Sequence, residues 1–259
     1  MAKSETTIIR PGLIRLGFKP ERFDYIIAIA GNPNTGKSTV FNALTGLRQH
    51  TGNWPGKTVV KTEGQYTFQN KRFQVVDLPG TYSLLSQSVD EEITRDFILF
   101  GKPDAVCIVV DASRLERNMN LVLQILQITN KPILCLNMMD EAERDGLEIN
   151  DTELSRELGI PVIPMVARQA KGIRELVETI HDVVSGTLIP QPKKIKLDEQ
   201  TQNAVNKLIP YIEQLLPGIP NSQWIALRVL ENDEKIIDAL KNKELEIWLK
   251  QVNGKEVFA

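Results

Sequence analysis

Cysteine, histidine and long hydrophobic runs are all scarce in this sequence of 259 residues. Its two cysteines are too few for a disulfide framework. The two histidines, His50 and His181, lie far apart and have no neighbours at the spacing of zinc or iron ligands. The longest apolar stretches, such as residues 105–110, are far shorter than the roughly 20 residues of a membrane-spanning helix. No secretory signal is expected, because the N-terminal residues lack an apolar core followed by a cleavage site. The net charge of -2 gives no electrostatic reason to expect a nucleic-acid partner. These shortages favour a globular protein of a reducing cytosol.

Short apolar runs do recur, with longer amphipathic stretches between them. Such runs are typical of parallel strands that are covered by helices on both faces. Cys107 and Cys135 fall in two of the runs and are expected to be buried thiols, not a redox pair. Residues 58–78 predict two strands joined by an Asn70–Lys71 turn, which places one antiparallel strand at the sheet edge. The sequence therefore predicts a doubly wound, mostly parallel α/β domain. The predicted strands are 25–30, 72–78, 105–112, 132–137 and 161–166, and the predicted helices are 37–46, 90–99, 117–129, 151–158 and 172–185.

The chain changes character after a Pro-flanked basic stretch, residues 188–196, which reads as a linker. Apolar residues beyond it fall at helical spacing, and Pro210 is expected to kink the first helix. Ten basic and ten acidic side chains follow residue 189, a balance that argues against an RNA-binding appendage. We expect an N-terminal extension of unassigned role (1–24), a nucleotide-binding domain (25–187) and a linker with a small all-α domain (188–259). The helical pattern comprises Val205, Leu208, Ile209, Ile212, Leu215 and Leu216, and further short helices are predicted at 224–232, 234–241 and 244–252.

Residues 31–38, Gly-Asn-Pro-Asn-Thr-Gly-Lys-Ser, fit a phosphate-binding loop. The pattern is specific because a predicted strand leads into it and a predicted helix leads out. Main-chain N–H groups of such a loop cradle the β-phosphate, Lys37 reaches the β- and γ-oxygens, and the Ser38 hydroxyl binds Mg²⁺. A glycine-rich turn of purely structural use is the alternative, which the strand–loop–helix setting disfavours. The predicted nucleotide contacts in this loop are Asn32, Asn34, Thr35, Gly36, Lys37, Ser38 and Thr39.

Three more positions are predicted to complete the magnesium and γ-phosphate site. Asp77 ends an apolar strand, where a carboxylate can hold Mg²⁺ through water. Gly80 leaves its N–H free to approach the γ-phosphate. Thr58 is the candidate switch threonine, which binds Mg²⁺ only when the γ-phosphate is present and so couples nucleotide state to loop order. Asp-x-x-Gly alone is a common turn, but its place downstream of a phosphate loop favours a switch. Trp54 is unusual in a loop, and it is expected to pack, bind a partner or shape a site.

The choice of base rests on residues 137–140, Asn-Met-Met-Asp. The Asp140 carboxylate can accept two hydrogen bonds from the ring N–H and the amine of guanine, whereas adenine would leave it unpaired. Sites built on such bonds discriminate by factors of up to about 10⁴–10⁵. Asn137 would brace the loops around the base, and Met138 would lie on it as an apolar surface, with modest affinity and rapid exchange. A loop aspartate that caps the next helix is the alternative. The predicted nucleotide is GTP.

Residues 166–172 are predicted to form the other wall of the base pocket. Val166 stands where this loop usually carries serine, so a hydroxyl contact is missing. Main-chain contacts from Ala167 and Arg168 are expected to remain.

Four segments together resemble the cytosolic G domain of FeoB, the prokaryotic ferrous iron transport protein. They are GNPNTGKSTVFNALTG, GNWPGKTVVKTEG, DLPGTYSL and NMMD, of which Gly-Asn-Trp-Pro-Gly is the most specific to that family. The resemblance covers about residues 25–185, and the helical unit after 190 matches the helical domain of that family in position. It implies a Ras-like P-loop GTPase fold followed by a small helical domain. Members continue into a membrane-spanning permease, so we expect a truncated chain or a separately encoded soluble part at the inner face of the cell membrane.

The resemblance also implies a role for Asn34, because the FeoB-like proteins that carry this asparagine are stimulated by potassium. By that resemblance, the Asn34 amide oxygen and carbonyls near Gly52 and Trp54 would hold K⁺ against the α- and γ-phosphates, in the place of an arginine finger. Thr81 stands where Ras-type enzymes carry a water-orienting glutamine. A hydrogen bond of Asn34 within its own turn is the alternative. The residues expected to act in hydrolysis are Asn34, Lys37, Thr58 and Gly80.

We therefore expect a Mg²⁺-dependent, potassium-stimulated, slow GTPase that regulates passage of Fe²⁺ through a permease partner. A ribosome- or tRNA-related GTPase and a GTP-dependent binding module with negligible turnover are the alternatives. Acidic runs such as residues 140–145 are interpreted as solvated helix faces and not as iron ligands. A homo-oligomer is compatible with the sequence, which specifies none.

Overall fold

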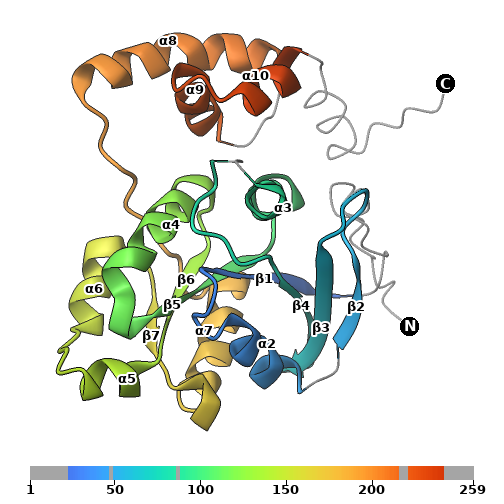
Figure 1. The fold of residues 1–259 in the computed structure, drawn as a ribbon, viewed down its shortest axis with the longest axis vertical. Helices are drawn as coiled ribbons and strands as arrows, with labels where there is room; N and C mark the ends of the chain where they lie inside the picture. The colour runs from blue at the N-terminus through green and yellow to red at the C-terminus, as the bar shows by residue number, and fades with distance from the viewer. Residues whose placement is uncertain (1–22, 47–48, 86–87, 216–220, 242–259) are drawn as a thin grey trace.

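The computed structural model describes residues 23–46, 49–85, 88–215 and 221–241. Helices flank a central sheet, and helices α8, α9 and α10 form a second group beyond it (Figure 1). The expected N-terminal extension up to residue 22, Leu216 and the helix predicted at 244–252 lie outside the described residues. Within the described part of the chain, no helix combines the length and apolar character needed to cross a bilayer.

Seven strands form one mostly parallel sheet in the order β2-β3-β4-β1-β5-β6-β7. The five apolar runs of the sequence correspond to its parallel strands, so the predicted doubly wound α/β class is confirmed. The carboxyl ends of β1 and β4–β6 meet at one edge, where ligands bind in folds of this class. These strands are β1 (Tyr25–Gly31), β4 (Lys71–Asp77), β5 (Ala105–Asp111), β6 (Pro132–Asn137) and β7 (Val162–Pro164).

The antiparallel edge of the sheet differs from the prediction in two respects. β3 (Val60–Phe68) pairs with β4 as expected, but the hairpin turn is Gln69–Asn70, with φ values of 47° and 60°, and not Asn70–Lys71. A two-residue turn with both φ values positive matches the twist of the strands that it joins. A further strand, β2 (Gln49–Asn53), pairs with β3 at the very edge. This strand was not predicted, because all five of its residues are exposed and none is apolar.

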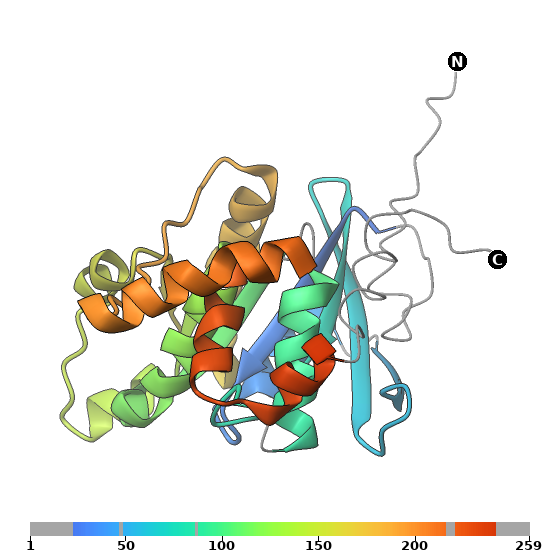
Figure 2. The same cartoon turned by 90° about the horizontal axis from the view of Figure 1, so that it is seen from above.

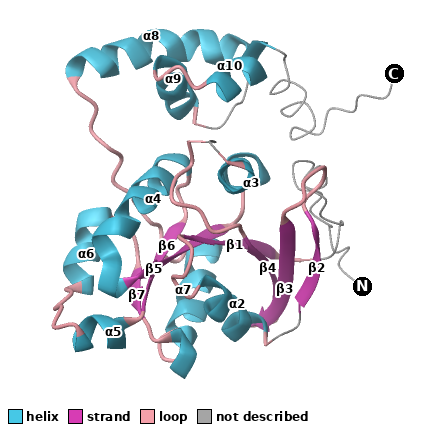
Figure 3. Cartoon of the chain, viewed as in Figure 1, coloured by secondary structure: helices cyan, strands magenta, loops and turns pink. Residues whose placement is uncertain are grey.

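Each face of the sheet has its own apolar core, because alternate residues of β1 point to opposite sides. Ile27 and Ile29 pack with α2 (Lys37–Thr45) and α7 (Ile173–Ser185). The opposite face is covered by α3 (Val89–Asp96), the π-helical turn Phe97–Gly101 that continues it, and α4 (Leu115–Ile128), as Figure 3 shows. The five predicted helices are present with ends shifted by no more than two residues if that turn is counted with α3. Short helix α5 (Met139–Arg144) was not predicted, and α6 (Asp151–Leu158) matches its predicted range.

The C-terminal group consists of α8 (Glu199–Leu215), α9 (Ser222–Leu230) and α10 (Glu234–Lys241). Val205 and Ile212 are buried, as their helical spacing predicts, but Leu215 is 62% exposed and is not part of the core. Helix α8 continues through Pro210, which therefore does not end it. Helix α10 matches its predicted range, and α9 begins and ends two residues earlier than predicted.

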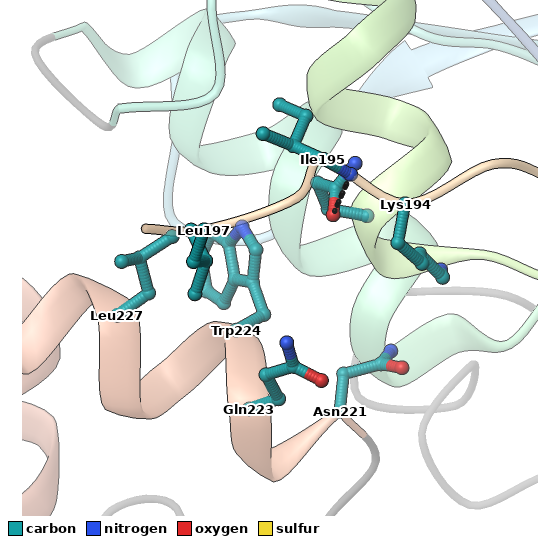
Figure 4. Close-up of a pocket in the computed structure, with 8 residues that line it drawn as sticks. Lys194, Ile195, Leu197, Asn221, Gln223, Trp224 and Leu227 are labelled. Atoms are coloured by element: carbon teal, nitrogen blue, oxygen red, sulfur yellow. Dashed lines mark hydrogen bonds between the residues drawn. The ribbon is translucent and has the colours of Figure 1, made fainter. Parts of the chain in front are cut away.

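The C-terminal helices lie over α3 and α4 when the molecule is seen from above (Figure 2). Lys194 Nζ donates to the carbonyl of Leu126 at 2.5 Å, and Asn221 Nδ2 donates to that of Ile128 at 2.8 Å. Both acceptors belong to the last turn of α4, whose carbonyls have no partner inside the helix. Burial lowers the pKa of Lys194. The indole of Trp224 and the linker wall a pocket of about 120 Å³ beside this contact (Figure 4).

Candidate nucleotide-binding site

The phosphate-loop sequence connects β1 to α2 at the carboxyl edge of the sheet. Gly36 adopts a left-handed conformation, with φ 81° and ψ 18°, just before α2 begins at Lys37. A side chain is excluded there, because a Cβ on Gly36 would lie 2.3 Å from Nδ2 of Asn137. The Thr35 hydroxyl donates to the Asn32 carbonyl at 3.0 Å, inside the turn. Asn34 is also left-handed, with φ 65°, and is exposed, as is Thr39.

Three side chains predicted to bind phosphate and magnesium meet beside this loop. Lys37 Nζ lies 2.5 Å from Oδ1 of Asp77, and both side chains are largely buried. Ser38 Oγ lies 3.4 Å from Oδ2 of the same carboxylate. A hydroxyl and a carboxylate oxygen side by side are donors of the kind that Mg²⁺ prefers.

The segment after Asp77 is fixed against the phosphate loop by main-chain contacts. Leu78 N–H donates to the Ile29 carbonyl at 2.9 Å, and Thr81 N–H donates to that of Gly31 at 3.3 Å. A Cβ on Gly80 would lie 3.3 Å from Cα of Pro33, so the two loops are close together. The Thr81 side chain is buried and its hydroxyl donates to the Ser83 carbonyl at 2.8 Å. Thr81 is therefore directed into its own turn, away from the place of a water-orienting side chain.

The segment that carries Gly52, Trp54 and Thr58 leaves β2 and returns along β3. The Trp54 indole is 2% exposed and packs edge-on against Phe97 at 5.8 Å. Of the three roles considered for this tryptophan, packing is therefore the one observed. The Trp54 carbonyl accepts the N–H of Lys57 at 3.0 Å, and Gly52 belongs to the β2–β3 ladder. Thr58 is exposed near the start of β3.

Lys57 of this segment joins a carboxylate shared with the C-terminal helices. Its Nζ lies 3.0 Å from one oxygen of Glu92 on α3, and Lys235 Nζ of α10 lies 3.4 Å from the other. Burial raises the pKa of Glu92, but the two ammonium groups reverse that shift and bring the pKa below its ordinary value. One carboxylate thus connects three parts of the chain.

Asn137 joins the phosphate loop to the loop after β7. Its Nδ2 donates to the Thr35 carbonyl at 2.9 Å, and its Oδ1 accepts the N–H of Ala167 at 3.0 Å. Met138 is left-handed, with φ 63°, and its methyl group lies over Gly36. Of the residues predicted to surround the base, the structure therefore brings Asn137, Met138 and Ala167 against the phosphate loop.

Asp140 contacts the side chain of Arg168, a residue for which only main-chain contacts were predicted. The Arg168 Nη2 bonds Oδ2 of Asp140, and its Nη1 lies 3.5 Å from Oε1 of Glu141. Desolvation raises the pKa of Asp140, but Arg168 outweighs it and holds the pKa below its ordinary value. The ion pair joins the first turn of α5 to the turn after β7, 28 positions along the chain, and no sequence pattern signals it.

A polar cleft of about 400 Å³ lies along the first half of the phosphate loop. Asn32 and Asn118 line it, are each 3% exposed, and carry amide atoms that have no hydrogen-bond partner among the described residues. The Arg117 guanidinium lies over the Tyr82 ring at 4.9 Å. Within the described ranges, no group of three or more His, Cys, Asp or Glu side chains is placed to hold a metal ion. Four of the residues that line the cleft, Asn32, Asn34, Thr35 and Met138, are predicted nucleotide contacts. The wall after β5 was not predicted, although Asp111 ends that strand at the carboxyl edge of the sheet. The other residues that line the cleft are Pro33, Ser113, Arg114, Glu141 and Asp145.

Comparison with known proteins gives two family matches along the chain. Residues 25–180 match the family described as ferrous iron transport protein B, and residues 198–255 match the FeoB cytosolic helical domain. The Fe(2+) transporter FeoB of Escherichia coli K12 is 40% identical over 213 residues, and that of Salmonella typhimurium is 38% identical over 224. The matches cover 80% of this chain but 27% of each transporter, so the chain spans about a quarter of their length.

Solved structures agree with these matches. The cytosolic domain of the T. maritima FeoB iron transporter in a GDP form has a TM-score of 0.77 at 33% identity, over 88% of this chain and 91% of that one. The cytosolic domain of L. pneumophila FeoB has a TM-score of 0.75 at 33% identity, over 89% and 90% of the two chains. Both matches extend beyond the sheet domain, because they cover 88–89% of this chain. This chain therefore belongs to the FeoB family and corresponds to its G domain followed by its cytosolic helical domain.

Proposed function

We propose that this chain binds GTP and hydrolyses it slowly to GDP and phosphate. The observation that carries the proposal is the pair of hydrogen bonds that Asn137 makes, donating to the Thr35 carbonyl and accepting from the Ala167 N–H. They hold a phosphate loop and a base-side loop at one edge. The Asp140 carboxylate beside them would accept the N–H donors of guanine. The T. maritima relative is described in GDP forms, which favours the same base here.

Hydrolysis would depend on positioned groups more than on a side-chain base. Main-chain N–H groups of the phosphate loop and Lys37 would hold the β- and γ-phosphates, and Gly80 N–H would approach the γ-phosphate. Because the Thr81 hydroxyl is engaged within its own turn, main-chain groups would hold the attacking water. This arrangement favours slow turnover.

Oxygen donors of this site are of the kind that Mg²⁺ and K⁺ take, and the neighbouring Ser38 hydroxyl and Asp77 carboxylate support the magnesium part of the proposal. Ser38, Thr58 and Asp77 would hold Mg²⁺, and Asn34 with the carbonyls of Gly52 and Trp54 would hold K⁺. The Asn34 side chain is exposed on the phosphate loop, where it can reach a bound cation. When bound, the two cations would neutralise charge that develops on the phosphates.

Two assays test these proposals. Titration with GTP and ATP should show binding of the guanine nucleotide and much weaker binding of ATP, and equal affinities would refute the base assignment. GTP turnover of the wild type should be faster in KCl than in NaCl, and Asn34→Ala should remove the difference. Equal rates in all four conditions would refute the potassium role, and no phosphate release over hours would favour a GTP-dependent binding module.

In the whole transporter we propose that this domain lies on the cytoplasmic side and regulates passage of Fe²⁺ through a permease portion. The names of the relatives support this setting. We place the boundary between the two domains at the linker near residue 188. A ribosome- or tRNA-related role has no support from the balanced charge of the helical part.

A further inference from the structure

We propose that Arg168 is an internal competitor of the guanine base for the carboxylate of Asp140. The inference rests on the proposed function, because it concerns how a guanine nucleotide enters that site. Arg168 would occupy Asp140 while the base is absent and would have to move aside when the base binds.

In the part of the chain that the structure describes, only one of the two carboxylate oxygens of Asp140 has a bonding partner. Its Oδ2 is bonded by Nη2 of Arg168, whereas its Oδ1 is buried and has no partner among the residues that the structure describes. A buried acceptor without a donor is costly, and guanine can supply one. Full pairing of guanine needs both oxygens, so Arg168 blocks one of the two positions.

The guanidinium group and the guanine edge present the same pattern of donors. Each offers parallel N–H groups in one plane, which match the two oxygens of a carboxylate. The arginine is charged, so its bond is the stronger one per donor and competes effectively. It also favours the ionised form of Asp140, as the lowered pKa indicates, and that is the form that guanine requires.

Glu141 is a second ion-pair partner for Arg168. Its Oε1 lies 3.5 Å from Nη1 of Arg168, and the arginine side chain is 57% exposed. When the base takes Asp140, Arg168 can therefore keep an ion pair with the neighbouring carboxylate. The exchange of partners lowers the cost of nucleotide entry and maintains rapid exchange.

Removal of the competitor should tighten nucleotide binding. Because exposed ion pairs are weak, Arg168→Ala should lower the Kd for GDP only about 1.4- to 5-fold and slow GDP release. Glu141→Gln should act in the opposite direction, because Arg168 then stays longer on Asp140. ADP makes no bond to this carboxylate, so its weak binding should not improve in Arg168→Ala.

The test is calorimetric titration of GDP and ADP into the wild type, the two variants and Arg156→Ala, at low and high KCl. Arg156 pairs with Glu153 on the surface of α6 and is a matched control for loss of one exposed arginine. The gain in GDP affinity of Arg168→Ala should shrink at high salt, because screening weakens the ion pair.

The outcomes are distinct. Tighter GDP binding by Arg168→Ala, with weaker binding by Glu141→Gln and no change in the control, supports the inference. A wild type that binds GDP while Arg168→Ala binds it equally or more weakly overturns the inference alone. A wild type that binds no GDP overturns the proposed function together with the inference. Circular dichroism of each variant checks that the fold is intact.

Discussion

Asn137→Ala should damage both the stability of the protein and its affinity for nucleotide. The side chain is 3% exposed and makes two hydrogen bonds, one at 2.9 Å to the Thr35 carbonyl and one at 3.0 Å from the Ala167 N–H. Alanine would leave both main-chain groups buried without a partner. Each such group costs about 1–3 kcal/mol, so the free energy of unfolding should fall by about 2–6 kcal/mol.

The assay is urea denaturation at equilibrium, with the GDP dissociation constant measured on the same samples. Asn150→Ala is the matched control, because Asn150 is exposed and caps α6 through one bond, in which its Oδ1 accepts the N–H of Glu153 at 2.9 Å. Loss of a cap costs about 1 kcal/mol and should leave GDP affinity unchanged. If Asn137→Ala destabilised no more than the control and bound GDP as the wild type does, the bracing role of Asn137 would be wrong.

Three other perturbations are informative. Gly36→Ala should abolish tight nucleotide binding, since its Cβ would lie 2.3 Å from Asn137, whereas Gly46→Ala, with φ 58° and open space around it, should bind normally in the same titration. The pKa of Glu92 is lowered in the folded state, so its ion pairs stabilise the protein above pH 4.5 and are lost as the pH falls through the lower folded value. The free energy of unfolding of Glu92→Gln should therefore fall less on acidification than that of the wild type. Parallel plots of unfolding free energy against pH for the two proteins would contradict this. Contact with Cys107 and burial raise the pKa of Cys135, so iodoacetamide at pH 8 should label neither thiol until urea is added, and rapid labelling of the native protein would contradict this.

The parallel part of the fold was predictable because burial leaves a direct signal in the sequence. Five strands covered on both faces read as continuous apolar runs. β2 carries no such signal, since Gln49–Asn53 is polar, lies at the sheet edge and is defined by its ladder with β3. Leu215 was assigned to a core because its spacing is helical, but spacing alone does not show which turn of a helix is covered.

The candidate site was predictable where a local motif and the order of the strands place its residues. It was not predictable where the contact depends on loop conformation. Lys37, Ser38 and Asp77 were expected together because a phosphate loop and the end of the next parallel strand meet in this fold class. The pairing of Arg168 with Asp140 depends on the paths of two loops, which no local pattern encodes. The same holds for Arg117 and Tyr82 beside the phosphate loop.

Helix α4 has a mechanical consequence. Its first turns border the polar cleft beside the phosphate loop through Asn118. Carbonyls of its last turn accept hydrogen bonds from Lys194 and Asn221. A helix of 14 residues is a stiff rod about 21 Å long. A displacement of the linker would therefore be transmitted along α4 to the wall of the cleft beside Asn32. No bond between the two ends of the helix would have to change.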